Sequence, residues 1–176
     1  MARKVLLAYA TRYGSTEEVA VTVAGKLREG GLAVEVQPVK KVRSLEGNEA
    51  VVLGTPIYVG SLLKDARKFL DGHQAELEKL PVAVFALGPI RAGEELLASR
   101  GQLETALAKT PWLKPVDTEV FVGKYDPDRL GMGDKMLTAL PASPLHGVPA
   151  QDDRDWDAIE AWAAKLARTL SGRVAV

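Results

Sequence analysis

The sequence predicts an α/β fold: an open, doubly wound parallel sheet with helices on both faces. Continuous apolar runs at residues 4–10, 50–54 and 82–87 are typical of strands that are buried on both faces. Apolar residues at helical spacing separate these runs, so that strands and helices alternate along the chain. Neither an internal repeat nor a linker divides the 176 residues, and we therefore expect residues 1–176 to form one domain.

The first half of the chain predicts three strands and two helices. We expect the helix after residues 4–10 to begin with a capping box, in which Ser15 is the N-cap and Glu18 is the third helical residue. Gly30 and Gly31 end this helix. The other predicted elements of this half are a strand at or near the sheet edge that contains Pro38 (33–38), a buried strand (50–54) and a short helix (64–70).

The second half predicts two more strands and three helices. A buried strand is expected over residues 82–87 and an alternating strand over residues 116–122. The helix between them, over residues 94–109, has four leucines on its expected apolar face: Leu96, Leu97, Leu103 and Leu107. A helix over residues 128–140, a Pro-rich loop and a last helix over residues 156–170 complete the chain.

Metal and thiol chemistry have little support in this sequence. There are no cysteines, which excludes disulfides, thiolate nucleophiles and cysteine-ligated metals. An acidic cluster precedes the last helix and comprises Asp152, Asp153, Asp155 and Asp157. Because acidic side chains stabilise the positive end of a helix, we favour helix capping over a metal site for this cluster. We therefore expect no metal ion.

The charge balance excludes one class of partner. Lys and Arg number 23 and Asp and Glu number 23, whereas a general nucleic-acid binder needs a basic excess.

The apolar run at residues 5–10 is too short for the core of a signal peptide. The longest weakly polar stretch, residues 50–63, is interrupted by glycine and proline and is too short to span a bilayer. We expect a cytoplasmic protein without nucleic acid or an integral membrane segment.

The loop after the first strand is suited to an anion. It runs directly into a helix, whose free N–H groups and dipole favour negative charge. Gly14 lets the backbone turn close to a phosphate, and Arg12 either contacts that phosphate or points into solvent. An ordinary turn and N-cap would use the same residue types, so this alternative stays open. The loop consists of Thr11, Arg12, Tyr13, Gly14, Ser15 and Thr16, and it lacks the motifs of NTPase P-loops and dinucleotide sites.

Two further loops follow the third and fourth strands and are unusually apolar. Two such loops could enclose a planar ring, and their glycines would leave main-chain amides free for its polar edge. The alternative is that their apolar side chains only pack on neighbouring loops. With the anion-suited first loop, an aromatic ring on a phosphorylated tail is the better account. The residues concerned are Thr55, Pro56, Ile57, Tyr58, Val59 and Gly60 in one loop, and Gly88, Pro89, Ile90, Arg91 and Gly93 in the other.

These three loops resemble those of the flavodoxins, which bind FMN. The Thr-Arg-Tyr-Gly-Ser-Thr loop is similar to the flavodoxin phosphate loop, and the other two fall where that family binds the isoalloxazine ring. Residues 123–127 and 155–159 look like those of the flavodoxin-domain branch that contains menaquinone-dependent protoporphyrinogen oxidase. The resemblance implies a five-stranded sheet in the order 2-1-3-4-5 and a bound FMN. It also implies Tyr58 as the stacking residue and Arg91 near the polar end of the ring.

The resemblance implies an FMN-dependent oxidoreductase in which the cofactor carries the chemistry, so no catalytic side chain is expected. The implied partners are a redox partner protein, a quinone or a porphyrinogen-type small molecule, and a peripheral membrane contact and a homodimer stay open. Two alternatives are a one-electron carrier flavodoxin and a non-catalytic flavin-binding module. Carriers of this family are usually acidic, which steers them to basic partners. The zero net charge therefore favours an oxidoreductase over a carrier.

Overall fold

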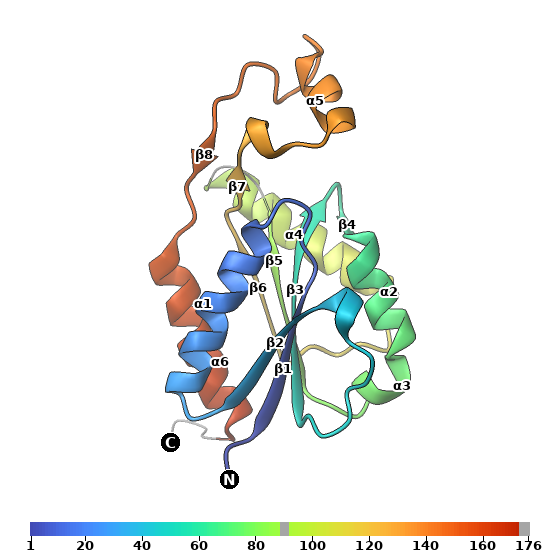
Figure 1. Ribbon diagram of the computed structural model, residues 1–176, viewed down its shortest axis with the longest axis vertical. Helices are drawn as coiled ribbons and strands as arrows, with labels where there is room; N and C mark the ends of the chain where they lie inside the picture. The colour runs from blue at the N-terminus through green and yellow to red at the C-terminus, as the bar shows by residue number, and fades with distance from the viewer. Residues whose placement is uncertain (89–91, 173–176) are drawn as a thin grey trace.

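The computed structural model describes residues 1–88 and 92–172 and confirms the α/β fold (Figure 1). The elements are, in chain order, β1 (Lys4–Tyr9), α1 (Ser15–Glu29), β2 (Ala33–Pro38), the 3-10 helix η1 (Val39–Lys41), β3 (Ala50–Tyr58), β4 (Ser61–Leu62), α2 (Lys64–Gly72), α3 (Gln74–Leu77), β5 (Val82–Leu87), α4 (Glu94–Ala108), β6 (Asp117–Phe121), β7 (Lys124–Tyr125), the 3-10 helix η2 (Pro127–Arg129), α5 (Met132–Ala139), β8 (Gln151–Asp152) and α6 (Trp156–Leu170).

The main sheet has the strand order β2-β1-β3-β5-β6, and neighbouring strands in this order are parallel. Numbering these five strands along the chain gives the expected order 2-1-3-4-5, with β2 at an edge as Pro38 predicts. The register places Tyr9 beside Gly54, and Leu87 beside Phe121. The carboxyl ends of β1, β3, β5 and β6 therefore meet at one edge of the sheet.

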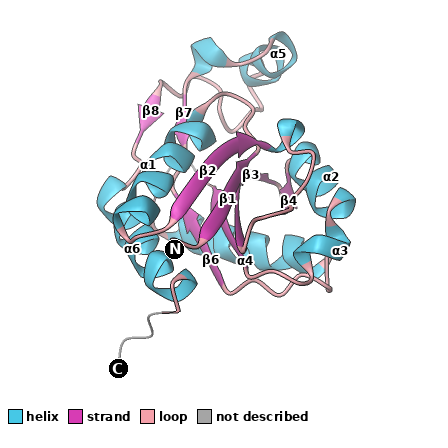
Figure 2. Ribbon diagram, turned by 60° about the horizontal axis from the view of Figure 1, so that its bottom comes forward, coloured by secondary structure: helices cyan, strands magenta, loops and turns pink. Residues whose placement is uncertain are grey.

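Helices cover both faces of the sheet, which explains why the inner strands β1, β3 and β5 are buried along almost their whole length. Alternate residues of β1 belong to two separate cores: Val5, Leu7 and Tyr9 to one, and Leu6 and Ala8 to the other. The first core includes side chains of α1 and α6, and the second includes side chains of α2, α3 and α4. Figure 2 shows these two groups of helices on opposite sides of the strands.

A small second sheet leads away from the main one at its carboxyl edge. β7 and β8 pair antiparallel, with Tyr125 opposite Gln151. The chain between them carries η2 and α5, neither of which has a buried residue. Figure 1 shows this part beyond the carboxyl ends of the strands, at the end of the molecule away from the N-terminus. It therefore covers the edge of the sheet without contributing to either core.

Two expected element boundaries are wrong. β3 continues to Tyr58, because residues 55–56 pair with β5 and residues 57–58 pair with β4, so residues 55–58 form strand rather than loop. The helix expected over residues 128–140 is divided into η2 and α5, since Gly131 between them has an extended backbone (φ −65°, ψ 162°). Both differences change the edge of the sheet where the expected site lies.

The predicted capping box is also wrong, and so is the predicted burial of Leu97 on the apolar face of α4. The N-cap of α1 is Gly14, which has a φ of 92° and makes no side-chain capping bond, while Glu18 pairs with Arg154. Leu97 is 65% exposed because it lies about 120° around α4 from the buried Leu103. The capping role expected for the acidic cluster is confirmed at Asp155, whose carboxylate accepts a hydrogen bond from the Ala158 N–H at 2.9 Å.

A membrane-crossing helix would need a long apolar run, and none of the helices within residues 1–88 and 92–172 has one.

Candidate functional site

A cavity of about 620 Å³ lies at the carboxyl edge of the main sheet. Its walls come from the loop after β1, from the ends of β3 and β5, and from residues 123–148, which we call the roof segment. Doubly wound sheets bind ligands at this edge, where the strand order reverses. The volume falls within the range of about 300–1,000 Å³ that is usual for small-molecule sites. The cavity is therefore our candidate functional site.

The loop after β1 has the features of a phosphate cradle. The Thr11 hydroxyl accepts a hydrogen bond from the Gly14 N–H at 2.8 Å, which closes the turn before α1 begins at Ser15. The first N–H groups of a helix have no partner within it and are free for an anion. Thr16 is buried, and among the described residues no group pairs with its Oγ1. Such an orphaned hydroxyl fits a bound phosphate, because a buried polar group without a partner is costly.

Arg12 and Tyr13 connect this loop to the roof segment through one carboxylate. Asp134 on α5 forms an ion pair with Arg12, with 2.7 Å between Oδ2 and Nη2, and accepts a hydrogen bond from the Tyr13 hydroxyl. The Arg12 guanidinium also lies 5.4 Å from the centre of the Tyr13 ring and 6.0 Å from that of the Tyr58 ring. The Arg12 side chain is therefore engaged between the two walls of the cavity.

The end of β3 presents Tyr58 to the cavity. Thr55 and Ile57 are buried in the strand, whereas Tyr58 is 43% exposed. Partial burial raises the pKa of the Tyr58 phenol, against an opposing effect of the Arg12 charge. The turn to β4 then uses Val59 and Gly60, whose φ angles are 47° and 70°. Tyr58 is thus the partly exposed aromatic side chain that β3 brings to the cavity.

The glycine amides expected to be free are engaged at two positions. The Gly88 N–H donates to the Phe121 carbonyl at 2.9 Å, and the Gly60 N–H donates to Gln102 Oε1 at 3.3 Å. A Cβ on Gly88 would lie 2.9 Å from the Ser99 Cβ, so this glycine allows close packing of β5 against α4. The expectation that these amides read a ligand is therefore wrong for Gly60 and Gly88.

The structure brings some of the expected site residues to the cavity and leaves others away from its walls. Residues that line it are Arg12, Tyr13, Ser15, Pro56, Ile57, Tyr58 and Gly88. Expected residues that do not line it are Thr11, Gly14, Thr16, Thr55, Val59, Gly60 and Gly93. The expected residues Pro89, Ile90 and Arg91 lie outside the described part of the structure.

Sequence reasoning missed most of the roof segment. The additional lining residues are Leu87, Glu95, Gly123, Lys124, Tyr125, Asp126, Arg129, Leu130, Asp134, Leu137, Thr138, Ser143, Pro144, Leu145 and Val148. One signal was available: the chain runs from residue 122 to residue 155 without a main strand or a core helix. Connections longer than about 12–15 residues are usually functional.

The roof segment gives the cavity an apolar wall with polar groups at one side. Leu130, Leu137, Leu145 and Val148 line the cavity although they lie in no buried core. Arg129 lies close to the phosphate cradle, since its Nη1 would be 3.7 Å from a Cβ placed on Gly14. An apolar chamber beside an anion site is suited to a flat organic ligand with a phosphorylated tail.

Arg154 fixes the first turn of α1 from outside the cavity. Its side chain is 3% exposed and lies 2.7 Å from both Glu18 Oε2 and Asp152 Oδ2. Its Nη1 also donates to the Ser15 carbonyl at 3.4 Å, and its guanidinium lies 4.7 Å from the centre of the Trp156 ring. Hydrogen bonding to Arg154 lowers the pKa of Asp152. Arg154 thus joins β8, where the roof segment returns to the core, to the helix that carries the phosphate cradle.

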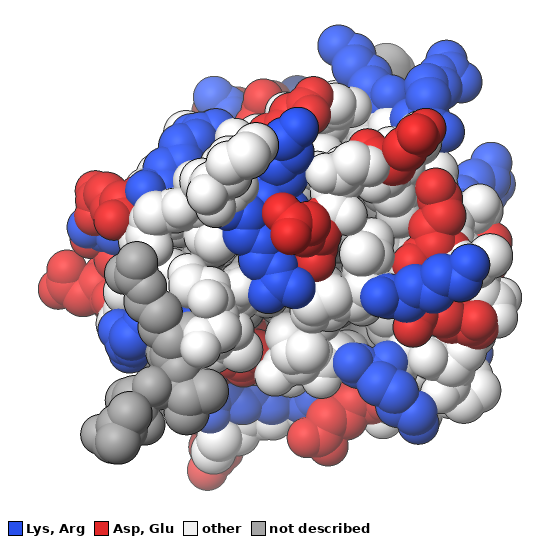
Figure 3. All heavy atoms as spheres, turned by 90° about the horizontal axis from the view of Figure 1, so that it is seen from below, with Lys and Arg blue, Asp and Glu red and all other residues white. Residues whose placement is uncertain are grey.

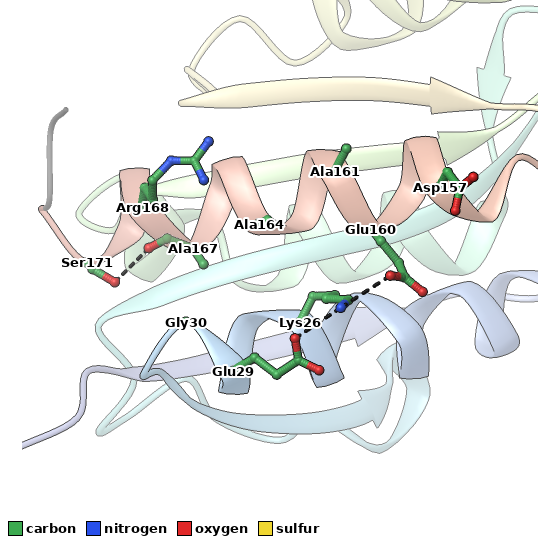
Figure 4. Close-up of a pocket in the computed structure, with 10 residues that line it drawn as sticks. All are labelled: Lys26, Glu29, Gly30, Asp157, Glu160, Ala161, Ala164, Ala167, Arg168 and Ser171. Carbon is green, nitrogen blue, oxygen red and sulfur yellow. Dashed lines mark hydrogen bonds and ion pairs between the residues drawn. The ribbon is translucent and has the colours of Figure 1, made fainter.

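The opposite end of the molecule has a different character. Figure 3 views that end and shows Lys and Arg side chains scattered among Asp and Glu side chains. A cavity of about 530 Å³ also lies between α1 and α6 (Figure 4). Lys26 at its wall is already paired with Glu29 and Glu160, at 3.0 and 3.2 Å. None of the expected site residues lines this second cavity, so we assign the function to the first.

Comparison with known proteins agrees with this fold. The sequence pattern of the flavodoxin domain family matches residues 6–147. Protoporphyrinogen IX dehydrogenase [quinone] of Escherichia coli (strain K12) is 29% identical over 86 residues, which are 48% of each chain. The match thus spans about half the length of this curated relative.

Solved structures of flavodoxins are similar in fold over nearly the whole chain. A cysteine-to-serine mutant of flavodoxin from Pseudomonas aeruginosa is 20% identical with a TM-score of 0.59, covering 96% of this chain and 99% of that one. Oxidised flavodoxin 1 from Bacillus cereus is 17% identical with a TM-score of 0.56, covering 98% and 99%. At sequence identities of 17% and 20%, these similarities show a shared fold.

Proposed function

We propose that this chain, which belongs to the flavodoxin-domain family, is an FMN-dependent oxidoreductase that acts on a flat apolar small molecule within the roofed cavity. Membership of the family makes it an FMN-binding electron-transfer protein. The buried, unpaired Thr16 hydroxyl and the open start of α1 fit the FMN phosphate. The FMN, when bound, supplies the electron-accepting and electron-donating chemistry.

The chain's own residues bind and enclose the cofactor. The loop of residues 11–16 would hold the phosphate, and Tyr58 at the end of β3 would lie against the ring. The roof segment would exclude water from the ring, because its apolar side chains line the far wall. Exclusion of water strengthens the electrostatic interactions inside a site and protects reduced groups from side reactions.

One observation carries the proposal of a small-molecule substrate: the cavity continues under the roof segment. A carrier exchanges electrons with a protein through an open cofactor edge, whereas here Leu130, Leu137 and Leu145 of the roof segment add a wall to the cavity. The net charge of zero also removes the strong acidic field that steers a carrier to its partners. The similarity to a protoporphyrinogen IX dehydrogenase [quinone] suggests a porphyrinogen as electron donor and a quinone as acceptor.

An anaerobic turnover assay tests this function. FMN-loaded protein is mixed with protoporphyrinogen IX and a menaquinone analogue, and porphyrin formation is followed by its fluorescence. We expect catalytic porphyrin formation that changes little as salt is raised, because the substrate is bound by apolar contacts. A protein that does not oxidise the porphyrinogen, yet cycles its flavin with a flavodoxin reductase at rates that fall steeply with salt, would instead be the one-electron carrier.

A further inference from the structure

The roof segment places one arginine beside the phosphate cradle without a close carboxylate partner. Arg129, at the end of η2, has its Nη1 3.7 Å from the position of a Cβ on Gly14, the N-cap of α1. Its ion pair with Asp126 is long, at 3.8 Å between Nε and Oδ2. The Arg129 side chain is 54% exposed, so the guanidinium is solvated and can turn toward the cradle.

Two other cations near the cradle, Arg12 and Arg154, are neutralised at short range. Arg12 lies 2.7 Å from Asp134, and Arg154 lies 2.7 Å from both Glu18 and Asp152. Lys124 faces Asp152 across the β7–β8 pair. Arg129 is therefore a weakly compensated positive charge, and it lies next to Gly14 of the cradle.

A positive charge beside the cradle would offset the acidic residues at the start of α1. Glu17 and Glu18 occupy the first turn of α1 and oppose a phosphate dianion at the same helix end. Arg154 compensates Glu18, whereas Glu17 forms no ion pair within the part of the chain that the structure describes. The helix dipole and the backbone N–H groups stabilise an anion, and a guanidinium adds charge-assisted hydrogen bonds of about twice the neutral strength.

We propose that Arg129 is a ligand of the FMN phosphate and that it makes this site prefer FMN to riboflavin. The inference rests on the proposed location of FMN in the roofed cavity. Since Arg129 belongs to the roof segment and Gly14 to the core, the phosphate would connect the two parts. The same contact would hold the roof segment over the ring.

The test compares two ligands that differ only in the phosphate. FMN and riboflavin are titrated separately into flavin-free protein, and binding is followed by quenching of flavin fluorescence. We expect Arg129→Gln to weaken FMN binding about 10- to 100-fold and to leave riboflavin binding unchanged. The wild-type affinity for FMN should fall with salt more steeply than that of the variant, because one ionic contact is lost.

Two matched variants separate a specific contact from a general effect of charge. Lys135→Gln removes a positive charge from the same roof segment at a residue that does not line the cavity. Arg168→Gln removes an exposed arginine of α6 at the second cavity (Figure 4). Both should keep the wild-type ratio of FMN to riboflavin affinity, and Arg129→Lys should recover part of it.

These titrations distinguish failure of the role of Arg129 from failure of the proposed function. Wild-type protein that binds no FMN would overturn the proposed function itself. FMN binding that is equal in wild type and Arg129→Gln would overturn only the role of Arg129. An equal loss of FMN and riboflavin affinity would also overturn it, since Arg129 would then order the roof segment rather than contact the phosphate.

Discussion

The hydroxyl of Thr16 should destabilise the FMN-free protein and strengthen the binding of FMN. It is 1% exposed and has no partner among the described residues, although it lies in the first turn of α1. A buried polar group without a hydrogen bond destabilises a protein by about 1–3 kcal/mol. The same hydroxyl can donate to a phosphate oxygen.

Thr16→Val should therefore change stability and affinity in opposite directions. We expect the FMN-free variant to be about 1 kcal/mol more stable, measured by urea unfolding, because the unpaired hydroxyl is gone. We expect its FMN affinity to fall about tenfold, because a phosphate partner is lost. The control is Thr105→Val, which removes the hydroxyl that donates to the Gly101 carbonyl at 2.9 Å on the exposed side of α4. Equal FMN affinity in the Thr16 variant would contradict the phosphate role.

Val59 is strained by its backbone rather than by its contacts. It has a φ of 47° and a side chain that is 98% exposed, and Gly60 after it has a φ of 70°. Left-handed backbone costs an L-residue about 1–2 kcal/mol, and two-residue turns with two positive φ angles favour Asn-Gly. Strain of this kind is often found beside functional sites.

Val59→Asn should raise the free energy of unfolding of the FMN-free protein by about 1 kcal/mol. Urea unfolding measures it, and the matched control is Val116→Asn, an exposed valine without a positive φ. The control should gain nothing. A Val59→Asn variant no more stable than wild type would show that the turn is not strained in solution.

At the scale of elements, Arg154 links β8 and α1, and this link should depend on pH. The pKa of Asp152 is lowered from its ordinary value of 3.8, chiefly by the hydrogen bond from Arg154. A carboxyl group whose pKa is lowered by folding stabilises the fold above its unfolded pKa, and this contribution is lost as the pH falls through the folded value. The relevant window is therefore below pH 3.8.

Asp152→Asn should be less stable than wild type near neutral pH, and this difference should shrink as the pH falls below 3.8. Because the Asp152 side chain is 39% exposed, solvent screening keeps the difference to about 1 kcal/mol or less. Urea midpoints over a pH series measure it. Asp153→Asn, which alters the adjacent exposed carboxylate, is the control, and a stability gap independent of pH would refute the link.

The elements also show what the sequence could predict. The strands of residues 33–38 and 82–87 and the helix of residues 156–170 have the predicted limits, because burial on the sheet imposes a clear apolar pattern on each. The end of β3 was not predictable, since its continuation depends on pairing with β5 and then β4, which are contacts between segments. The prediction of a capping box was wrong for a similar reason, because Glu18 pairs with Arg154, which is distant in sequence and cannot be found from the local pattern.

For the whole molecule, the sequence predicts the core and its loops better than it predicts the roof segment. The first loop and Tyr58 could be identified because the carboxyl ends of parallel strands must share one edge of the sheet. Most of the roof segment could not, because its leucines pack in neither core. Its position depends on particular polar contacts, such as that of Asp134 with Arg12 and Tyr13.

Most of the roof segment, from residue 126 onward, can therefore be removed without opening the core. Tyr125 and Gln151 are directly opposite in the β7–β8 pair, so a two-residue Asn-Gly turn can replace residues 126–150. η2 and α5 contribute no buried residue, and the shortened protein should keep the flavodoxin-like core. It should still bind FMN through residues 11–16, with lower affinity because Arg129 is absent.

The most direct test of the account is anaerobic reduction of the bound flavin by protoporphyrinogen IX, in wild-type and shortened protein that are both saturated with FMN. The yellow absorption of the flavin reports its reduction, and dithionite confirms that both proteins hold reducible flavin. We expect the porphyrinogen to bleach the wild-type protein and to leave the shortened protein yellow, because the roof segment forms the substrate wall. Equal bleaching of both proteins, or none in the wild type, would contradict a substrate site under the roof segment.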